Sequence, residues 1–155
     1  MDLNNMDISV EQIKTLREET GVSIGKCKEA LTEAAGDITK AKELLREISA
    51  KNAAKKADRE LAAGIVSAYI HPNNTIGVLV KLGCETDYVA RNEDFISLAH
   101  NVGMHIAAMG TENIEELLEQ PFIKNPEITI AKLVEEATLK IGERIEVSEF
   151  SRFAV

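Results

Sequence analysis

The stretch Gly64–Leu82, GIVSAYIHPNNTIGVLVKL, decides how the larger part of this chain folds. Ile65–Ile70 is rich in β-branched and aromatic residues, and Thr75–Leu82 has the same character. Between them, His71-Pro72-Asn73-Asn74 consists of residues that favour a tight turn. The pattern predicts a β-hairpin, and we expect it to open a domain that starts near Gly64.

Helices are predicted to follow this hairpin. Asn92 is expected to cap a long helix that ends at Gly110, and a shorter helix is expected over Ile114–Glu119. The apolar face of the long helix consists of Phe95, Leu98, Ala99, Val102, Ile106 and Met109. Pro121 and Pro126 then bracket a predicted loop.

A final helix and a final strand complete the domain. Thr129 is predicted to cap the helix, and Gly142 follows its end. The strand Arg144–Phe153 alternates between apolar and polar residues but slips once, which indicates a β-bulge. Residues 64–155 are therefore predicted to form an α+β domain, with a three-stranded antiparallel sheet covered by helices on one face.

Three short helices are predicted before the hairpin. Each follows a residue that caps helices well: Ser9, Ser23 and Asp37. Ser9 and Gln12 have the spacing of a capping box, and Gly21 and Gly36 are expected to end the first two helices. The apolar stripes are Val10, Ile13 and Leu16; Cys27, Ala30, Leu31 and Ala34; and Ile38, Ala41, Leu44, Leu45 and Ile48. Because each stripe is narrow, the three helices must pack together as one bundle.

These patterns divide the chain into four segments: a tail (1–8), a three-helix module (9–49), a basic helical linker (50–63) and the α+β core (64–155). The linker contains the only basic stretch of the sequence, with Lys51, Lys55, Lys56 and Arg59. Its helix propensity is high and its apolar stripe is weak, which favours a solvated connector.

Composition excludes several classes of function. The 155 residues carry a formal charge of −8, which argues against a general nucleic-acid binder and against attachment to an anionic membrane. No apolar run approaches the roughly 18 residues that a transmembrane helix needs. Met1–Asp7 resembles neither a signal peptide nor a transit peptide. With only two cysteines, we expect a reduced, cytoplasmic protein.

The sequence contains no pattern for a metal or a nucleotide. His100 and His105 are five residues apart, so they lie on different faces of one helix. Cys27 and Cys84 belong to different predicted domains, and the glycines match no phosphate-binding loop. We therefore expect no metal and no cofactor.

Thiol catalysis is a further hypothesis. Cys84 could act as a nucleophile with His105 or His71 as base and Asp87 as orienting group. Nothing in the spacing brings these residues together, and a single cysteine at a strand end is more often a small buried apolar residue. His105 itself lies at the edge of an apolar stripe, which is typical of a partly buried, hydrogen-bonded histidine.

The segment that follows the hairpin, Cys84–Asn92, favours a docking site. Thr86 and Asp87 could simply cap a helical turn. Tyr88 and Val89, however, lie just beyond the end of a strand, where we expect them to be exposed. A docking site needs a ring that can enter a pocket of the partner, and a carboxylate beside it can fix the register of the contact. From the residues alone, both interpretations stay open.

Thr86-Asp87-Tyr88-Val89 closely resembles the Thr-Asp-Phe-Val signature of the elongation factor Ts family. Other stretches that are similar to this family occur in the same order: Leu16–Gly21, Cys27–Leu31 and Gly36-Asp37 in its UBA-like module, then Met104–Met109 and Lys140–Ile145 in its core. The resemblance extends from about Ser9 to Phe153.

The resemblance implies a non-catalytic guanine nucleotide exchange factor for the GTPase elongation factor Tu. Asp87 and Tyr88 match the pair that wedges between two helices of the GTPase near its Mg²⁺ site, within the signature Thr86–Val89. Other positions that match partner-binding residues of the family are Lys14, Arg17 and Ile24 in the module and His105 in the core.

Two departures from the family leave alternatives open. Tyr88 stands where the family has Phe, and only about ten residues separate Met109 from Gln120, where family members carry additional helices. Short members suggest a homodimer, which the unpaired sheet edge also favours. The shortened core favours the alternative of a module that docks on a GTPase without exchanging its nucleotide. Ubiquitin binding is a weaker alternative, because Gly21–Gly25 lacks the Met-Gly-Phe/Tyr loop of ubiquitin-binding bundles.

Overall fold

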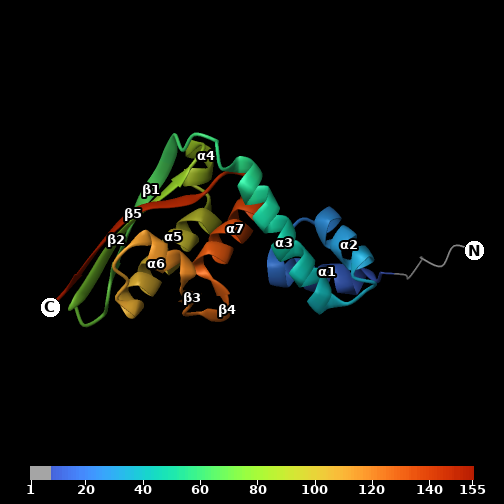
Figure 1. Cartoon of the computed structure of the whole chain (residues 1–155), viewed down its shortest axis with the longest axis horizontal. Helices are drawn as coiled ribbons and strands as arrows, with labels where there is room; N and C mark the ends of the chain where they lie inside the picture. The colour runs from blue at the N-terminus through green and yellow to red at the C-terminus, as the bar shows by residue number, and fades with distance from the viewer. Residues whose placement is uncertain (1–7) are drawn as a thin grey trace, which may run out of the picture.

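The structure, a computed structural model, describes residues 8–155, so all of the expected tail except Ile8 lies outside the described residues. The chain forms a three-helix module at one end and an α+β core with its sheet at the other (Figure 1). Two separate clusters of buried apolar side chains, one in each part, form the interior.

The module contains α1 (Val10–Thr20), α2 (Ile24–Glu33) and α3 (Ile38–Lys56). The side chains of Ser9 and Gln12 each bond the other's backbone amide, which confirms the capping box. Ser23 and Asp37 cap the next two helices as predicted.

The ends of these helices depend on glycine. Gly21, with φ +67°, ends α1 as predicted. The second helix ends at Glu33 and not at Gly36, because Ala35 and Gly36 both adopt positive φ and turn the chain away. Helix α3 continues to Lys56, so the first half of the expected linker is the last part of this helix.

Most of the predicted module core is confirmed, since Leu16, Cys27 and Leu31 are completely buried. The prediction for Val10 is wrong, because its side chain is 82% exposed. Each three-residue step along a helix displaces the side chain by about 60° around the helix axis. Val10 is six residues before Leu16, so its side chain points about 120° away from that of Leu16.

The sheet consists of β1 (Ala63–Ile70), β2 (Ile76–Cys84) and β5 (Glu146–Ala154), antiparallel in the order β1-β2-β5. This confirms the predicted hairpin and the predicted three-stranded sheet. The bulge is confirmed too: Lys81 pairs with Glu149 and Leu82 with Val147, which leaves one extra residue in β5.

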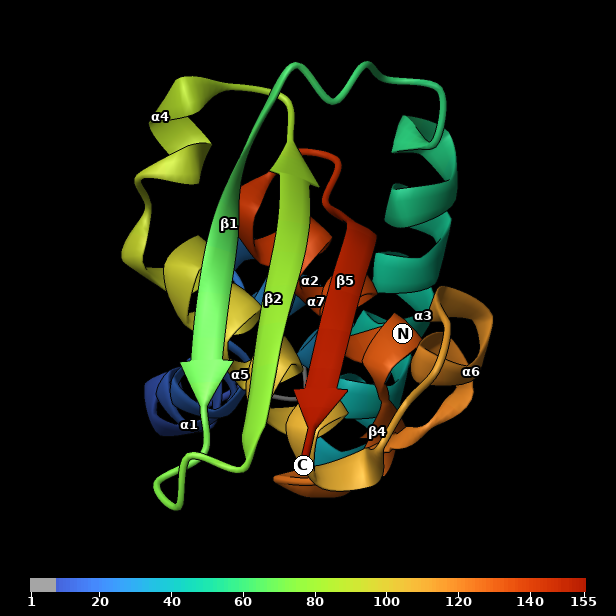
Figure 2. The same cartoon turned by 90° about the vertical axis from the view of Figure 1, so that its left-hand side faces the viewer.

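Helices cover one face of this sheet. They are α5 (Glu93–Met109) and α6 (Ile114–Glu119), with α7 (Ile130–Ile141) behind α5 on the side away from the sheet and the four-residue α4 (Asp87–Ala90) beside the end of β2. Their predicted caps Asn92 and Thr129 and the glycines that end α5 and α7 are confirmed. Figure 2 looks onto the opposite face of the sheet, which no other element of the described chain covers.

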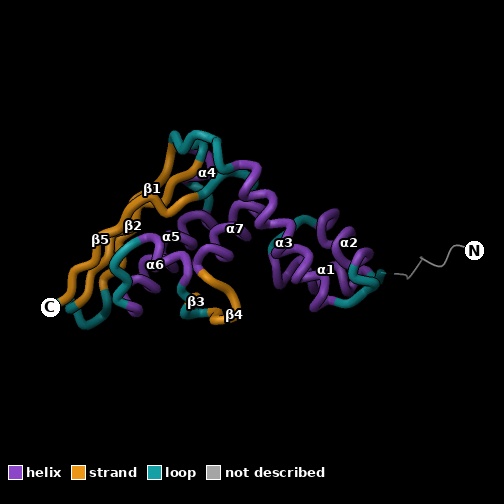
Figure 3. The backbone as a smooth tube through the Cα atoms, viewed as in Figure 1, coloured by secondary structure: helices purple, strands orange, loops and turns teal. Residues whose placement is uncertain are grey.

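The segment predicted as a loop between two prolines contains a small ribbon instead. Strands β3 (Pro121–Phe122) and β4 (Asn125–Thr129) pair with each other and lie apart from the main sheet (Figure 3). Because such a short pair is held by backbone hydrogen bonds and has no apolar alternation of its own, the sequence pattern does not reveal it.

Candidate docking site

Helix α4 is a single turn that exposes two of its four side chains. Thr86 caps it by accepting a hydrogen bond from the amide of Val89, at 3.3 Å. Asp87 is exposed, and the side chain of Tyr88 is 80% exposed, which confirms the expectation for Tyr88. Val89 was expected to be exposed as well, but it is buried, because successive residues of a helix point about 100° apart. Val89 therefore anchors the turn, while Asp87 and Tyr88 face outward.

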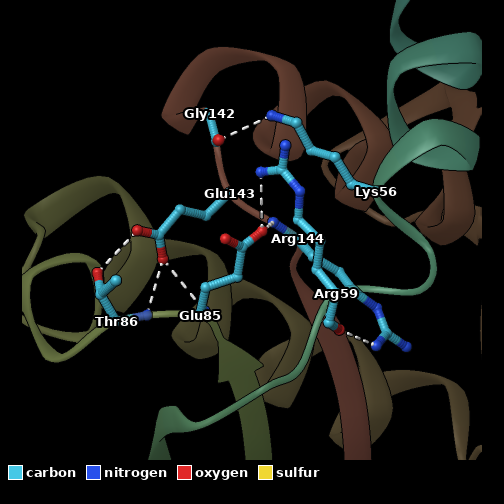
Figure 4. Close-up of polar contacts among 7 residues, drawn as sticks. All are labelled: Lys56, Arg59, Glu85, Thr86, Gly142, Glu143 and Arg144. Carbon is cyan, nitrogen blue, oxygen red and sulfur yellow. Dashed lines mark hydrogen bonds and ion pairs between the residues drawn. The ribbon is translucent and has the colours of Figure 1, made fainter.

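The backbone before this turn is held by the carboxylate of Glu143, from the loop between α7 and β5 (Figure 4). One carboxylate oxygen accepts from the amides of Glu85 and Thr86, at 3.1 and 3.0 Å. The other accepts from the Thr86 hydroxyl, at 2.7 Å. These contacts join two segments that lie almost 60 residues apart in the chain.

Glu85 makes the reverse contact. Its carboxylate accepts the amide of Arg144, at 2.7 Å, and a hydrogen bond from the Arg59 side chain, at 3.3 Å (Figure 4). The amide of Arg144 and then the Arg59 guanidinium lower the pKa of the Glu85 carboxyl group, although its partial desolvation acts in the opposite direction. Glu85 is therefore held as a carboxylate beside the turn.

The basic linker is attached to the same loop. The Lys56 ammonium donates to the carbonyl of Gly142, at 2.7 Å, and the Arg144 side chain donates to the carbonyl of Arg59, at 2.5 Å (Figure 4). Two of the basic residues expected in a solvated connector thus contact the core. No residue pattern in the sequence predicts these contacts. The segment Lys140–Ile145 is included only in the family resemblance.

The residues expected to bind a partner through the module are all on its surface. Lys14 and Arg17 are exposed on α1, where Lys14 lies 3.9 Å from Glu18 in a solvent-exposed pair. Ile24, at the start of α2, is 53% exposed. In Figure 2, α1 and α4 both lie toward the left of the view, and Figure 1 shows that they are separated along the long axis of the molecule.

His105 is not on the surface. It is completely buried, and its Nδ1 accepts from the amide of Ile123, at 3.2 Å. Nε2 must therefore carry the proton, which it donates to the side-chain oxygen of Gln120, at 2.9 Å. Burial lowers the pKa of His105, and the Gln120 hydrogen bond only partly opposes this. The prediction of a hydrogen-bonded histidine is confirmed, and in this structure the ring offers no surface for the expected contact with a partner.

The structure removes the hypothesis of thiol catalysis. Cys84 is completely buried, and its thiol donates to the carbonyl of Thr86, at 3.3 Å. Burial, followed by the nearby Glu143 carboxylate, raises the pKa of Cys84. A nucleophilic cysteine needs the opposite environment. Cys84 instead packs in the core beneath the turn.

Residues 8–155 contain no group of three or more His, Cys, Asp or Glu side chains arranged to hold a metal ion. Among the same residues, no helix is both long and apolar enough to cross a membrane.

The fold thus defines a chain in two parts: a three-helix module, and an α+β core that exposes a braced helical turn. The family model described as "Elongation factor TS" matches residues 7–116 and again 85–155. The elongation factor Ts of Petrotoga mobilis is 40% identical over 195 residues, covering 97% of this chain and 99% of that protein. The chain belongs to the elongation factor Ts family.

Two further relatives with the same name are similar. The protein from Herpetosiphon aurantiacus is 35% identical over 195 residues, with 97% of this chain and 98% of the relative covered. The protein from Microcystis aeruginosa is 39% identical over 195 residues, with 96% and 78% covered. Because this chain has 155 residues, at least 40 positions of each alignment have no counterpart in it.

Proposed function

We propose that this protein is a guanine nucleotide exchange factor that binds elongation factor Tu and promotes the release of its GDP. The single observation that carries the proposal is the α4 turn, where Asp87 and Tyr88 are exposed while Val89 and the capping Thr86 hold the turn in place. An exposed ring beside a carboxylate, on a backbone that is already ordered, can enter a partner's surface with little loss of entropy.

The proposed mechanism is thermodynamic coupling. A factor that binds the nucleotide-free GTPase more tightly than the GDP-bound form must weaken GDP binding by the same factor. GTPases hold their nucleotide through Mg²⁺ and through loop amides that point at the phosphates. Insertion of Tyr88 and Asp87 near these groups would displace them, so GDP would leave faster and GTP would then displace the factor.

The module and the core have different proposed roles. Lys14, Arg17 and Ile24 would hold the GTPase through the exposed surface of the module. The buried His105 would act from inside, since it links α5 to Gln120 and to the backbone of Ile123. The proposed mechanism requires no covalent step, so the protein would not be an enzyme in the usual sense. It would act in the cytoplasm, where translation takes place.

We also propose that a second copy of the chain pairs with the open face of the sheet. This face carries four large apolar side chains that are at least half exposed: Val66, Ile70, Leu79 and Phe153. They project from all three strands, and Ile70 and Phe153 lie on either side of Gly77 in the register. Large exposed apolar side chains gathered on one face of a monomer often mark a protein–protein interface.

The exchange function can be tested by measuring the release of fluorescent GDP from elongation factor Tu in stopped flow. We expect this protein to accelerate release, and Asp87→Ala/Tyr88→Ala to abolish most of the acceleration. The matched control is Glu112→Ala/Met109→Ala, which removes an exposed acid and an exposed apolar side chain elsewhere. Binding without any acceleration by the unaltered protein would overturn the proposal in favour of a docking module that does not exchange nucleotide.

The tyrosine of the turn can be tested in the same assay. Tyr88→Phe restores the residue of the family signature, and we expect at most a small change in release rate. The reason is that the hydroxyl of an 80% exposed ring can stay hydrated at the edge of an interface.

A further inference from the structure

We propose that Glu143 is a positioning residue for the docking turn: it orders the backbone of Glu85 and Thr86 so that Asp87 and Tyr88 are presented in one orientation. This inference rests on the proposed exchange function, because it assigns a role to the turn that carries that function. Glu143 is distant from the turn in sequence and reaches it only through the tertiary fold.

The first argument is the number of bonds that one side chain makes. The Glu143 carboxylate accepts from two consecutive amides and from the hydroxyl of Thr86. Hydrogen bonds to an ionised group are stronger than bonds between neutral groups. The same Thr86 oxygen accepts from the amide of Val89, so a continuous series of bonds runs from Glu143 through Thr86 into the turn.

The second argument is that the contact is reciprocal. While Glu143 holds the backbone of Glu85, the Glu85 carboxylate holds the backbone of Arg144, at 2.7 Å. Gly142 ends α7 with φ +89°, a conformation that favours glycine, and Glu143 follows directly after it. Each segment thus fixes the main chain of the other, and Figure 4 shows the two carboxylates side by side between them.

The third argument concerns the chain on the N-terminal side of the exposed pair. Helix α4 has only four residues, and so short a helix has no stability of its own. Val89 and Ala90 anchor its inner side in the core, but they lie after the exposed pair. The chain before the pair is held by Glu143 and by the hydrogen bond from the Cys84 thiol to the carbonyl of Thr86, so Glu143 supplies three of the hydrogen bonds that fix this end of the exposed segment.

Three substitutions separate hydrogen bonding from charge. Glu143→Gln removes the charge but keeps a carbonyl oxygen for the two amides. Glu143→Asp keeps the charge but is one methylene shorter, so it cannot reach all three donors. Glu143→Ala removes both the charge and the hydrogen-bond acceptors. If the hydrogen bonds to the turn matter, the rate of GDP release should fall in the order Glu, Gln, Asp, Ala at position 143. If only the negative charge matters, Asp should be the best replacement.

The experiment is a titration of each variant against elongation factor Tu loaded with fluorescent GDP. It yields the maximal release rate and the concentration of factor that gives half of it. We expect Glu143→Ala to lower the maximal rate about tenfold, and to change the half-saturating concentration less, because the module still binds. Glu143→Gln should keep most of the rate, and the control Glu119→Ala should keep all of it. Equal rates for Ala and wild type, or better activity for Asp than for Gln, would overturn the inference.

A second measurement needs no partner and keeps the two proposals distinguishable. Amide hydrogen exchange in the free protein should be slow at Glu85 and Thr86, faster in Glu143→Ala and Glu143→Asp, and slow again in Glu143→Gln. The amides of α5 serve as the folding control in each variant. If these two amides exchange equally in all variants, the inference fails even where exchange activity is found. If the wild type releases no GDP, the proposed function fails, while this measurement still decides the role of Glu143 in ordering the turn.

Discussion

Tyr88 and His105 differ in whether their side chains can contact a partner directly. The family resemblance implies partner binding for both, yet Tyr88 is 80% exposed and His105 is completely buried. Tyr88 lies on a helical turn outside the sheet, whereas His105 lies on the inner face of α5, where both ring nitrogens are hydrogen-bonded. Direct contact is therefore available to the first residue, and the second stabilises the core behind it.

We expect the burial of His105 to make stability depend on pH. Because burial lowers the folded-state pKa of His105 below its ordinary value of 6.5, the unfolded chain takes up a proton first as the pH falls. The contribution to stability is therefore fully present above pH 6.5 and is lost below it, by at most about 1.4 kcal/mol per pH unit. Urea midpoints measured between pH 7 and 5 should show this loss.

The variant His105→Gln should remove this part of the pH dependence, whatever its effect on stability at pH 7. His100→Gln is the matched control, because His100 lies on the same helix but is exposed. If wild type and His105→Gln have parallel pH profiles, His105 does not titrate as its burial requires.

At the scale of elements, α7 joins the two parts of the molecule. Figure 1 shows it between α5, which lies against the sheet, and α3 of the module. Leu139 of α7 is buried among the apolar side chains of the module, while Leu133 packs against the core cluster. Glu136, on the same helix, lies 3.5 Å from Arg46 of α3. Burial raises the pKa of Glu136, and Arg46 opposes this effect.

We expect Leu139→Ala to loosen the module from the core. Truncation of a buried leucine costs about 2–4 kcal/mol, and here the lost contacts are those between the two parts. Amide hydrogen exchange should therefore accelerate in α1 and α2, with a smaller change in the sheet. Leu133→Ala is the matched control, and it should leave exchange in α1 and α2 unchanged. The same acceleration in both variants would contradict this role of α7.

At the scale of the whole molecule, the open face of the sheet predicts a dimer. Burying Leu79, Phe153 and the other exposed apolar side chains of this face against a second copy would remove them from water. In sedimentation velocity, we expect wild type to form dimers that dissociate on dilution, and Leu79→Ser/Phe153→Ser to remain a monomer. Ile96→Ser/Ile123→Ser, which changes two exposed apolar residues outside the sheet, should still form dimers. A wild type that stays monomeric at high concentration would refute the prediction.

The caps and the hairpin were predictable from the sequence because they depend on neighbouring residues. Ser9, Asn92 and Thr129 satisfy amides two or three positions away, and glycines with positive φ end their helices locally. The two strands of the hairpin are separated by residues that favour a tight turn, so the position of the turn can be predicted from residue type. The family resemblance in turn identified the exposed turn as the candidate site, and the structure shows how that turn is exposed.

The remaining features were decided by tertiary structure. Val10 is predicted to be buried and Val89 to be exposed, but the structure shows the reverse for both, since burial depends on which elements pack against a residue. The β3–β4 ribbon is too short to have a periodic pattern. The contact of Glu143 with Glu85 and Thr86 joins positions almost 60 residues apart. Local periodicity contains no information about such pairs, so only the folded chain brings the carboxylate to the turn that it holds.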